Sequence, residues 1–331
     1  MTTAPQQLLS SLNDALGGTV FGMEETIRGL CIALVNRGHV LLEGVPGLGK
    51  TLLAKTLAVH MGGEFRRIQC TADLMPSDLT GVHVYHPEKR DFEFVSGPLF
   101  ADIVLVDEIN RTGPKTQSAL LQAMEEGFVS IDRNTYSLPE DFFVIASQNP
   151  HEFEGTYPLP ESQLDRFLLR LQMSYPEPER EEMVLRTYNN PGGGHEFDPD
   201  SIQKMDKNLL RQTRDAVEAV YVSGAIYSYV QQIAQKTRQH PQIALGLSTR
   251  GALALMRCAR VSAAFDGQEY VTPDEVKAVA GAVIGHRLIL SPDTMLEGLS
   301  TGEVLETVIS DVEVPRDLAP VTDENTSLSG T

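Results

Sequence analysis

Residues 44–51 read Gly44-Val45-Pro46-Gly47-Leu48-Gly49-Lys50-Thr51, and this stretch decides the fold. It matches the pattern G-x-x-x-x-G-K-[ST], in which glycines let consecutive backbone N–H groups turn toward phosphate oxygens. The lysine of such a loop reaches the β- and γ-phosphates, and the threonine hydroxyl ligates Mg²⁺. The apolar run 39–42 before it predicts a strand, and 51–58 after it predicts a helix. The sequence therefore predicts a nucleoside triphosphate site formed by residues 44–51 and Leu52.

Short apolar runs alternate with helical patterns from about residue 20 to about residue 175. Continuous apolar strands separated by helices are typical of a parallel sheet covered on both faces. Beyond residue 175 the strand patterns nearly stop, and amphipathic patterns predict helices instead. The expected strands contain 40–42, 65–68, 103–106, 142–146 and 168–171, and the expected helices include 216–237, 249–265 and 272–284.

These patterns predict four segments along the chain. A nucleotide-binding core with an N-terminal helical segment covers 1–185, and a linker over 186–212 contains the triple glycine Gly192–Gly194. A smaller all-helical domain covers 213–302. An acidic, Ser/Thr-rich tail over 303–331 is expected to be frayed at its end.

Composition and charge restrict the class of protein. The 331 residues carry a formal net charge of −18, which argues against tight duplex binding because affinity for phosphate backbones comes from clustered Lys and Arg. Three widely spaced cysteines, Cys31, Cys70 and Cys258, predict buried thiols in a reducing compartment. The start lacks the pattern of a secretory signal, and no apolar run reaches the roughly 18 residues of a membrane span. We expect a soluble cytoplasmic protein.

Two acids follow the predicted strand 103–106. At the carboxyl end of a parallel strand, Asp107 and Glu108 lie where ligands bind. Asp107 is suited to the second coordination shell of Mg²⁺, and Glu108 is suited to polarising an attacking water. Asn149 follows the next strand and is predicted to bond the γ-phosphate or the water, although a lone Asn at a strand end is also a turn former. A carboxylate base beside a phosphate loop predicts ATP hydrolysis.

The motifs follow one another in the order of a known family. After the phosphate loop come Val-Asp-Glu-Ile-Asn-Arg (106–111), Ser-Gln-Asn-Pro (147–150), Leu-Pro-Glu-Ser-Gln-Leu-Asp-Arg-Phe (159–167) and Leu-Ser-Thr-Arg-Gly-Ala (247–252). From about residue 20 to about 290, the chain resembles AAA+ ATPases of the MoxR family. The resemblance implies an α/β core, with a parallel sheet flanked by helices and with hairpin inserts, followed by a smaller all-α helical lid. It also implies ATP and Mg²⁺ as cofactors.

The resemblance assigns roles to further residues. Phe21 and Gly22 resemble the stretch beside the adenine, and Asn149 resembles sensor 1. Arg166 resembles the arginine finger that reaches the ATP of a neighbouring subunit, and Arg250 resembles the sensor 2 arginine of the lid. A guanidinium can neutralise the charge that develops on the γ-phosphoryl group. Arg250 is predicted to lie at the start of a helix, where a cation is unfavourable against the helix dipole, and a bound phosphate would compensate that charge.

Each of three arginines, Arg166, Arg250 and Arg111, has two possible interpretations from the sequence. Arg166 is an interface residue or forms a salt bridge to Asp165 or Glu161 of its own chain. Arg250 serves the ATP of its own subunit or of a neighbour. Arg111, just after the two acids, is an interface arginine or a partner in a local ion pair.

Two alternating segments, 81–95 and 127–138, predict β-hairpins around polar turns. They resemble the helix-2 insert and the pre-sensor-1 hairpin of the branch that contains MoxR proteins, chelatases and MCM helicases. In that branch the hairpins point toward the ring pore or its surface and move with the nucleotide state. The alternative is two surface hairpins without a mobile role. His83 and His86 lack companion ligands at metal spacing and are predicted to face solvent.

The resemblance implies a hexameric ring that remodels or matures a client protein complex, together with a von Willebrand factor A-type partner. The alternatives are the ATPase subunit of a metal chelatase, a nucleic-acid motor related to MCM helicases, and an assembly scaffold that hydrolyses ATP very slowly. The acidic balance disfavours the motor, and the presence of Glu108 and Arg166 disfavours the scaffold.

Overall fold

The chain forms two compact units, residues 1–213 and residues 214–331. The computed structural model describes residues 2–17, 20–150, 155–188, 197–316 and 318. The triple glycine of the expected linker and the end of the expected tail lie outside the described residues.

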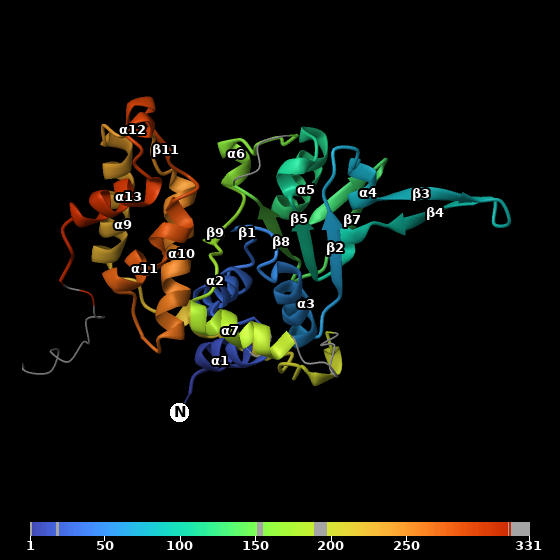
Figure 1. Ribbon diagram of the computed structural model, residues 1–331, viewed down its shortest axis with the longest axis horizontal. Coiled ribbons are helices and arrows are strands. Elements are labelled where there is room, and N and C mark those ends of the chain that lie inside the picture. The colour runs from blue at the N-terminus through green and yellow to red at the C-terminus, as the bar shows by residue number, and fades with distance from the viewer. Residues whose placement is uncertain (1, 18–19, 151–154, 189–196, 317, 319–331) are drawn as a thin grey trace, which may run out of the picture. The chain divides into compact units, whose positions relative to one another are not determined.

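The first unit contains a central sheet, two hairpins and flanking helices (Figure 1). Its strands are β1 (Val40–Glu43), β2 (Phe65–Gln69), β3 (Gly81–His86), β4 (Asp91–Ser96), β5 (Ile103–Asp107), β6 (Phe128–Ile131), β7 (Asn134–Ser137), β8 (Phe143–Gln148) and β9 (Leu169–Gln172). Its helices are α1 (Ala4–Gly17), α2 (Glu24–Val35), α3 (Lys50–Met61), α4 (Pro76–Thr80), α5 (Pro114–Glu126), α6 (Glu161–Leu164) and α7 (Pro178–Tyr188), with short 3₁₀ turns η1 (Pro98–Phe100), η2 (Ile109–Arg111) and η3 (Pro199–Ser201).

The second unit is mainly helical, and α8 crosses the division between the units. Its elements are α8 (Leu209–Ala219), α9 (Gly224–Gln239), β10 (Ile243–Leu245), α10 (Thr249–Phe265), α11 (Pro273–Ile284), β11 (Ile289–Leu290), α12 (Pro292–Leu296) and α13 (Thr301–Ser310).

The five strands predicted from the sequence form one parallel sheet in the order β2-β5-β8-β1-β9. The three middle strands are buried almost throughout, as expected for a parallel sheet with both faces covered. β2 differs because it is an edge strand, in which Ile68 is buried while Arg66, Arg67 and Gln69 are exposed. Its polar face becomes important at the site.

Alternation along the strands divides the core between the two faces of the sheet. Val104 and Val106 of β5 belong to one apolar cluster with Leu120 and Leu121 of α5. The intervening side chains of β5 point to the opposite face, where α3 packs against β5 and β2 (Figure 1). Asp107 alternates with Val104 and Val106 along β5, so its side chain points to the face that α3 covers.

Both predicted hairpins are confirmed, since β3 pairs with β4 and β6 pairs with β7 in antiparallel register. The prediction that His83 faces solvent is wrong, because its side chain is only 17% exposed and links the hairpins. Its Nδ1 lies 3.0 Å from Asp132 Oδ2 and its Nε2 lies 3.0 Å from the Tyr136 hydroxyl. The His86 side chain is 42% exposed and lies 3.5 Å from Glu93.

The helical predictions for the second unit are correct for 249–265 and 272–284, which are α10 and α11. The single helix expected over 216–237 is wrong. The chain breaks between α8 and α9 because the Tyr221 amide donates to Glu269 O, and Ser223 then caps α9 by accepting from the Ile226 amide at 3.3 Å.

The segment expected to be a tail from residue 303 begins with a helix. Ser300 and Glu303 form a capping box, and Val304, Leu305 and Val308 are buried where α13 packs on α9 and α11. The helix therefore belongs to the second unit.

Two other predictions concern the chain as a whole. The three cysteines are free and buried, and burial raises each thiol pKa to about 12. Within the described ranges, no helix has the length and apolar character needed to cross a membrane.

Candidate active site

The phosphate loop connects β1 to α3. Gly47 and Gly49 have φ angles of +88° and +77°, in the left-handed region that side chains with a Cβ rarely adopt. A Cβ on Gly49 would also lie 3.1 Å from Val20 Cγ1, so the segment before Phe21 packs beside the loop. Lys50 begins α3, and its Nζ donates to the Gly44 carbonyl at 2.5 Å. The loop thus opens at the positive end of a helix, which favours phosphate binding.

Parallel register brings polar side chains from β2 and β5 into one row. Arg67 pairs with Leu105, and Gln69 pairs with Asp107. Neighbouring residues in register share a face of the sheet, so Arg67, Gln69 and Asp107 all point to the α3 face. Ser147 lies on the same face of β8, next to Asp107. The carboxyl edge of the sheet therefore collects a cation, an amide, a carboxylate and a hydroxyl in front of the loop.

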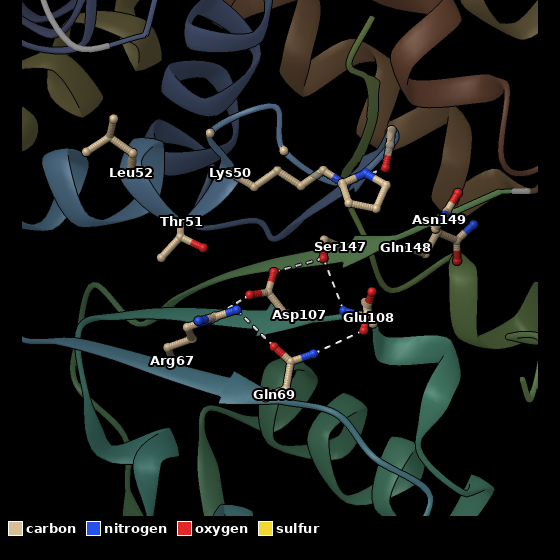
Figure 2. Close-up of a pocket in the computed structure, with 14 residues that line it drawn as sticks. Lys50, Thr51, Leu52, Arg67, Gln69, Asp107, Glu108, Ser147, Gln148 and Asn149 are labelled. Atoms are coloured by element: carbon tan, nitrogen blue, oxygen red, sulfur yellow. Dashed lines mark hydrogen bonds and ion pairs between the residues drawn. The ribbon is translucent and has the colours of Figure 1, made fainter. Parts of the chain in front are cut away.

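These groups line a cavity of about 420 Å³. Most residues predicted for the nucleotide site lie around it (Figure 2). The lining residues are Gly44, Pro46, Gly47, Gly49, Lys50, Thr51, Leu52, Arg67, Gln69, Asp107, Glu108, Ser147, Gln148 and Asn149. Val45 and Leu48 of the loop are not among them, and Leu48 is buried.

A hydrogen-bonded network joins the two acids (Figure 2). Arg67 Nε donates to Asp107 Oδ2 at 2.7 Å, and its Nη2 donates to Gln69 Oε1 at 2.9 Å. The Gln69 amide then donates to Glu108 Oε2 at 3.1 Å. On the other side, the Ser147 hydroxyl donates to Asp107 Oδ1 and accepts from the Glu108 amide, each at 3.1 Å. Both carboxylates are thereby held in defined orientations.

Glu108 has an unusual backbone. Its φ and ψ are 57° and 53°, the left-handed conformation, which is uncommon for a residue other than glycine. This turn directs the Glu108 side chain away from the line of β5 and into the cavity. Arg111 Nε lies 3.1 Å from Glu108 Oε2, so the structure contains the local ion pair that was one of the two interpretations of Arg111. Strained backbone of this kind clusters at functional sites.

Two opposing effects act on the pKa of Lys50, namely its burial and the nearby acids. Burial lowers the pKa of Lys50 below its usual value of 10.5, while the negative charges of Asp107 and Glu108 act in the opposite direction. The acids thus help to retain the ammonium charge that a nucleotide phosphate requires.

The donor set fits a magnesium ion that arrives with a nucleotide. Within the described part of the chain, no group of three or more His, Cys, Asp or Glu side chains is arranged to hold a metal. Mg²⁺ usually takes one or two protein oxygens, with phosphate oxygens and waters completing its octahedron. The Thr51 hydroxyl and the Asp107 carboxylate line the same cavity and can supply those protein oxygens.

Phe21 and Gly22 do not line the cavity. Gly22 has a φ of +73° and lies against Pro176 and Arg180, so residues 21–22 pack near the start of α7. Together with the contact between Val20 and Gly49, this places the segment beside the loop rather than in front of the acids.

Arg166 also lies outside the cavity lining. It follows α6, and its Nε is 3.3 Å from Glu125 Oε2 of α5, with the Arg166 side chain 29% exposed. This ion pair within the chain has a different acid from the two that the sequence suggested. Arg250 belongs to the second unit, where it is exposed in the first turn of α10 behind the N-cap Ser248.

Sequence reasoning missed Arg67, Gln69, Ser147 and Gln148. The signal for the first two was weak: Arg-Arg-Ile-Gln (66–69) contains one apolar residue, Ile68, so it is not the continuous apolar run of a strand buried on both faces. Gln148 donates to Glu43 Oε1 at 2.6 Å at the end of β1, and this contact joins two strands whose pairing the sequence does not specify.

Comparisons with known proteins agree with this architecture. Residues 39–169 match the family model described as ATPase family associated with various cellular activities (AAA), and residues 235–308 match the model of the AAA lid domain. A crystal structure of a protein from Cytophaga hutchinsonii superposes with a TM-score of 0.86 at 39% identity, covering 94% of this chain and 96% of that chain.

Relatives match over most of their own length. The chain is 47% identical over 283 residues to the uncharacterized protein YeaC of Bacillus subtilis, with 86% of this chain and 87% of that protein covered. It is 38% identical over 307 residues to Chaperone MoxR1 of Mycobacterium tuberculosis, with 90% and 80% covered. It is 31% identical over 301 residues to Protein MoxR of Paracoccus denitrificans, with 84% and 87% covered. The chain is an ATPase and belongs to the MoxR family of AAA+ proteins.

Proposed function

We propose that this ATPase couples Mg²⁺-dependent hydrolysis of ATP to the remodelling or maturation of a client protein complex, and that it works as a cytoplasmic ring of identical subunits. The observation that carries the proposal is the single cavity in which the phosphate loop faces Asp107 and Glu108. A site that only bound nucleotide would not need a carboxylate held at hydrogen-bonding distance from an orienting amide.

Each group at the cavity has a physical task in the proposal. The backbone N–H groups of residues 44–51, except Pro46, which has none, hold the phosphates together with the Lys50 ammonium. The Thr51 hydroxyl and the Asp107 carboxylate would supply oxygens around the metal. When bound, Mg²⁺ would supply positive charge that stabilises the negative charge developing on the phosphate oxygens as the terminal P–O bond breaks. The Glu108 carboxylate accepts a hydrogen bond from the attacking water and polarises it, and Asn149 orients that water or the γ-phosphate.

The ring is proposed because Arg166 has no place in the cavity of its own chain. Its contact with Glu125 is partly exposed, and exposed ion pairs are worth about 1 kcal/mol or less, so a nucleotide on a neighbouring subunit can compete for the guanidinium. Arg250 at the start of α10 is proposed as a second phosphate sensor, in its own subunit or across the interface.

The client role is supported by the name of the relative Chaperone MoxR1 and by the exposed apolar side chains of the first hairpin. Val82, Val84, Tyr85, Phe92 and Val95 are all at least 39% exposed. Such side chains on a projecting ribbon suit transient contact with other proteins. A von Willebrand factor A-type protein is the proposed partner, and a nucleic acid is not.

A photocrosslinking residue tests the hairpin's role. Placed at Phe92, which is 64% exposed, it should form crosslinks to a client or partner protein whose yield changes between ATP and ADP. Tyr175 is 69% exposed and lies outside both hairpins, so the same probe there serves as the matched control. Equal crosslinking at the two positions would contradict a client role for the hairpin.

Mixed rings test the shared site. Arg166→Ala and Glu108→Gln subunits should each be inactive alone, and mixing them should restore ATPase activity through interfaces that combine an intact Glu108 with an intact Arg166. Arg166→Ala mixed with the Glu108→Gln/Arg166→Ala double variant is the control, because no interface then contains both groups. Absence of recovery in oligomers shown to be mixed would contradict a role for Arg166 across the interface.

A further inference from the structure

Arg67 brings a fixed positive charge to the end of the cavity where the metal is expected. Its guanidinium donates through Nε to Asp107 Oδ2 at 2.7 Å, and its side chain is 49% exposed against 11% for Asp107. The position follows from the fold, since the register of β2 on β5 places Arg67 and Asp107 on the same face of the sheet.

The contact occupies the carboxylate that the magnesium shell requires. Asp107 Oδ1 already accepts from the Ser147 hydroxyl, so Arg67 takes the other oxygen of the same group. A charge-assisted bond of this length is among the stronger hydrogen bonds in proteins. A divalent cation that uses the same oxygen, directly or through a bound water, meets both the competition of the guanidinium and its repulsion.

We infer that Arg67 competes with Mg²⁺ for Asp107, so that the metal must displace a built-in cation before the nucleotide is held in its final form. The inference rests on the proposed function, in which Asp107 belongs to the Mg²⁺ shell.

Displacement of the Arg67 guanidinium also affects Glu108, through Gln69. Arg67 Nη2 donates to Gln69 Oε1, and the Gln69 amide donates to Glu108 (Figure 2). When the guanidinium leaves Asp107, the amide that orients Glu108 loses its own support. Arrival of the metal is thereby linked to the contacts of the group that handles the attacking water.

Nucleotide affinity with and without metal measures the competition directly. A fluorescent ADP analogue is titrated into the full-length protein in EDTA and in saturating Mg²⁺. The dissociation constant in EDTA divided by the dissociation constant in Mg²⁺ gives the coupling between metal and nucleotide, and it exceeds one when Mg²⁺ strengthens nucleotide binding. Arg67→Met removes the competing cation while keeping the aliphatic stem, and it should raise this ratio roughly fivefold. Arg67→Lys keeps the charge and should stay within about twofold of the wild-type ratio.

Arg66 supplies the matched control. It is the preceding residue of β2, points to the opposite face, and pairs with Glu64 at 2.6 Å. Arg66→Met changes the net charge and the strand by the same amount and should leave the ratio unchanged. Arg67→Gln is a second neutral variant, for use if the methionine variant does not fold.

The outcomes separate the inference from the proposed function. A wild-type ratio above one that neither neutral Arg67 variant raises overturns the competition and leaves the magnesium site in place. An equal rise in Arg66→Met also overturns it, because the effect would then come from net charge alone. A wild-type ratio of one contradicts the magnesium role of Asp107 itself.

Discussion

Stability should fall at mildly acidic pH because of one buried histidine beneath the site. His39 immediately precedes β1, and its Nδ1 accepts from the Val144 amide at 3.1 Å while its Nε2 donates to the Met124 carbonyl at 3.0 Å. The ring thus connects β1, β8 and α5 in its neutral form. Burial lowers the pKa of His39 from 6.5 to about 4, and the bond to Met124 opposes this only in part.

The magnitude follows from proton linkage. Below pH 6.5 the unfolded chain binds a proton at His39, whereas the native ring stays neutral down to about pH 4. The native state is therefore favoured above pH 6.5 and loses this advantage as the pH falls, at about 1.4 kcal/mol for each pH unit. Between pH 7 and pH 5 the loss is about 2 kcal/mol.

Urea unfolding of the wild type and of His39→Gln, followed by circular dichroism at pH 7, 6 and 5, checks this expectation. His39→Gln cannot titrate, so the difference in unfolding free energy between the two proteins should shrink by about 2 kcal/mol from pH 7 to pH 5. Other acids and histidines titrate in both proteins and cancel in the difference. A difference that stays constant over this range would refute the neutral, buried state of His39.

Three further outcomes are expected. Glu108→Gln should keep its contact with Gln69, bind ATP, and lose turnover by at least about a hundredfold, as measured by phosphate release; normal turnover would remove Glu108 from the mechanism. His83→Phe keeps a ring beside Phe94 but loses both bonds to the second hairpin, so amide hydrogen exchange in β6 and β7 should accelerate, and unchanged exchange would show that the link is not needed. Thr272→Ala removes the N-cap of α11 and should destabilise the second unit by about 1 kcal/mol in thermal unfolding, with no loss expected if the capping box contributes nothing.

The strands of the core were predictable because local sequence determines them. The three middle strands β1, β5 and β8 are buried on both faces. A continuous apolar run has no other stable position in a sheet of this kind. The phosphate loop was predictable for a similar reason, since the backbone angles at Gly47 and Gly49 require glycine.

The predictions that failed depend on contacts between segments far apart in the sequence. The break between α8 and α9 follows from pairing of Tyr221 with Tyr270, which no local pattern reveals. His83 is covered by Tyr136, 53 residues later in the chain. Arg67 enters the site only because β2 is the edge strand and aligns with β5 in a particular register. Strand order and register are tertiary properties, so the contacts of Arg67 and Gln69 with the two acids were visible only in the structure.

The most direct test of a site shared between subunits is the ATPase rate per subunit as a function of protein concentration, with the mass followed by light scattering in the presence and absence of ATP. If Arg166 completes the site of a neighbour, the rate per subunit should climb with concentration as a ring-sized mass appears. A constant rate from a monomer would confine catalysis to one chain and contradict the proposed ring.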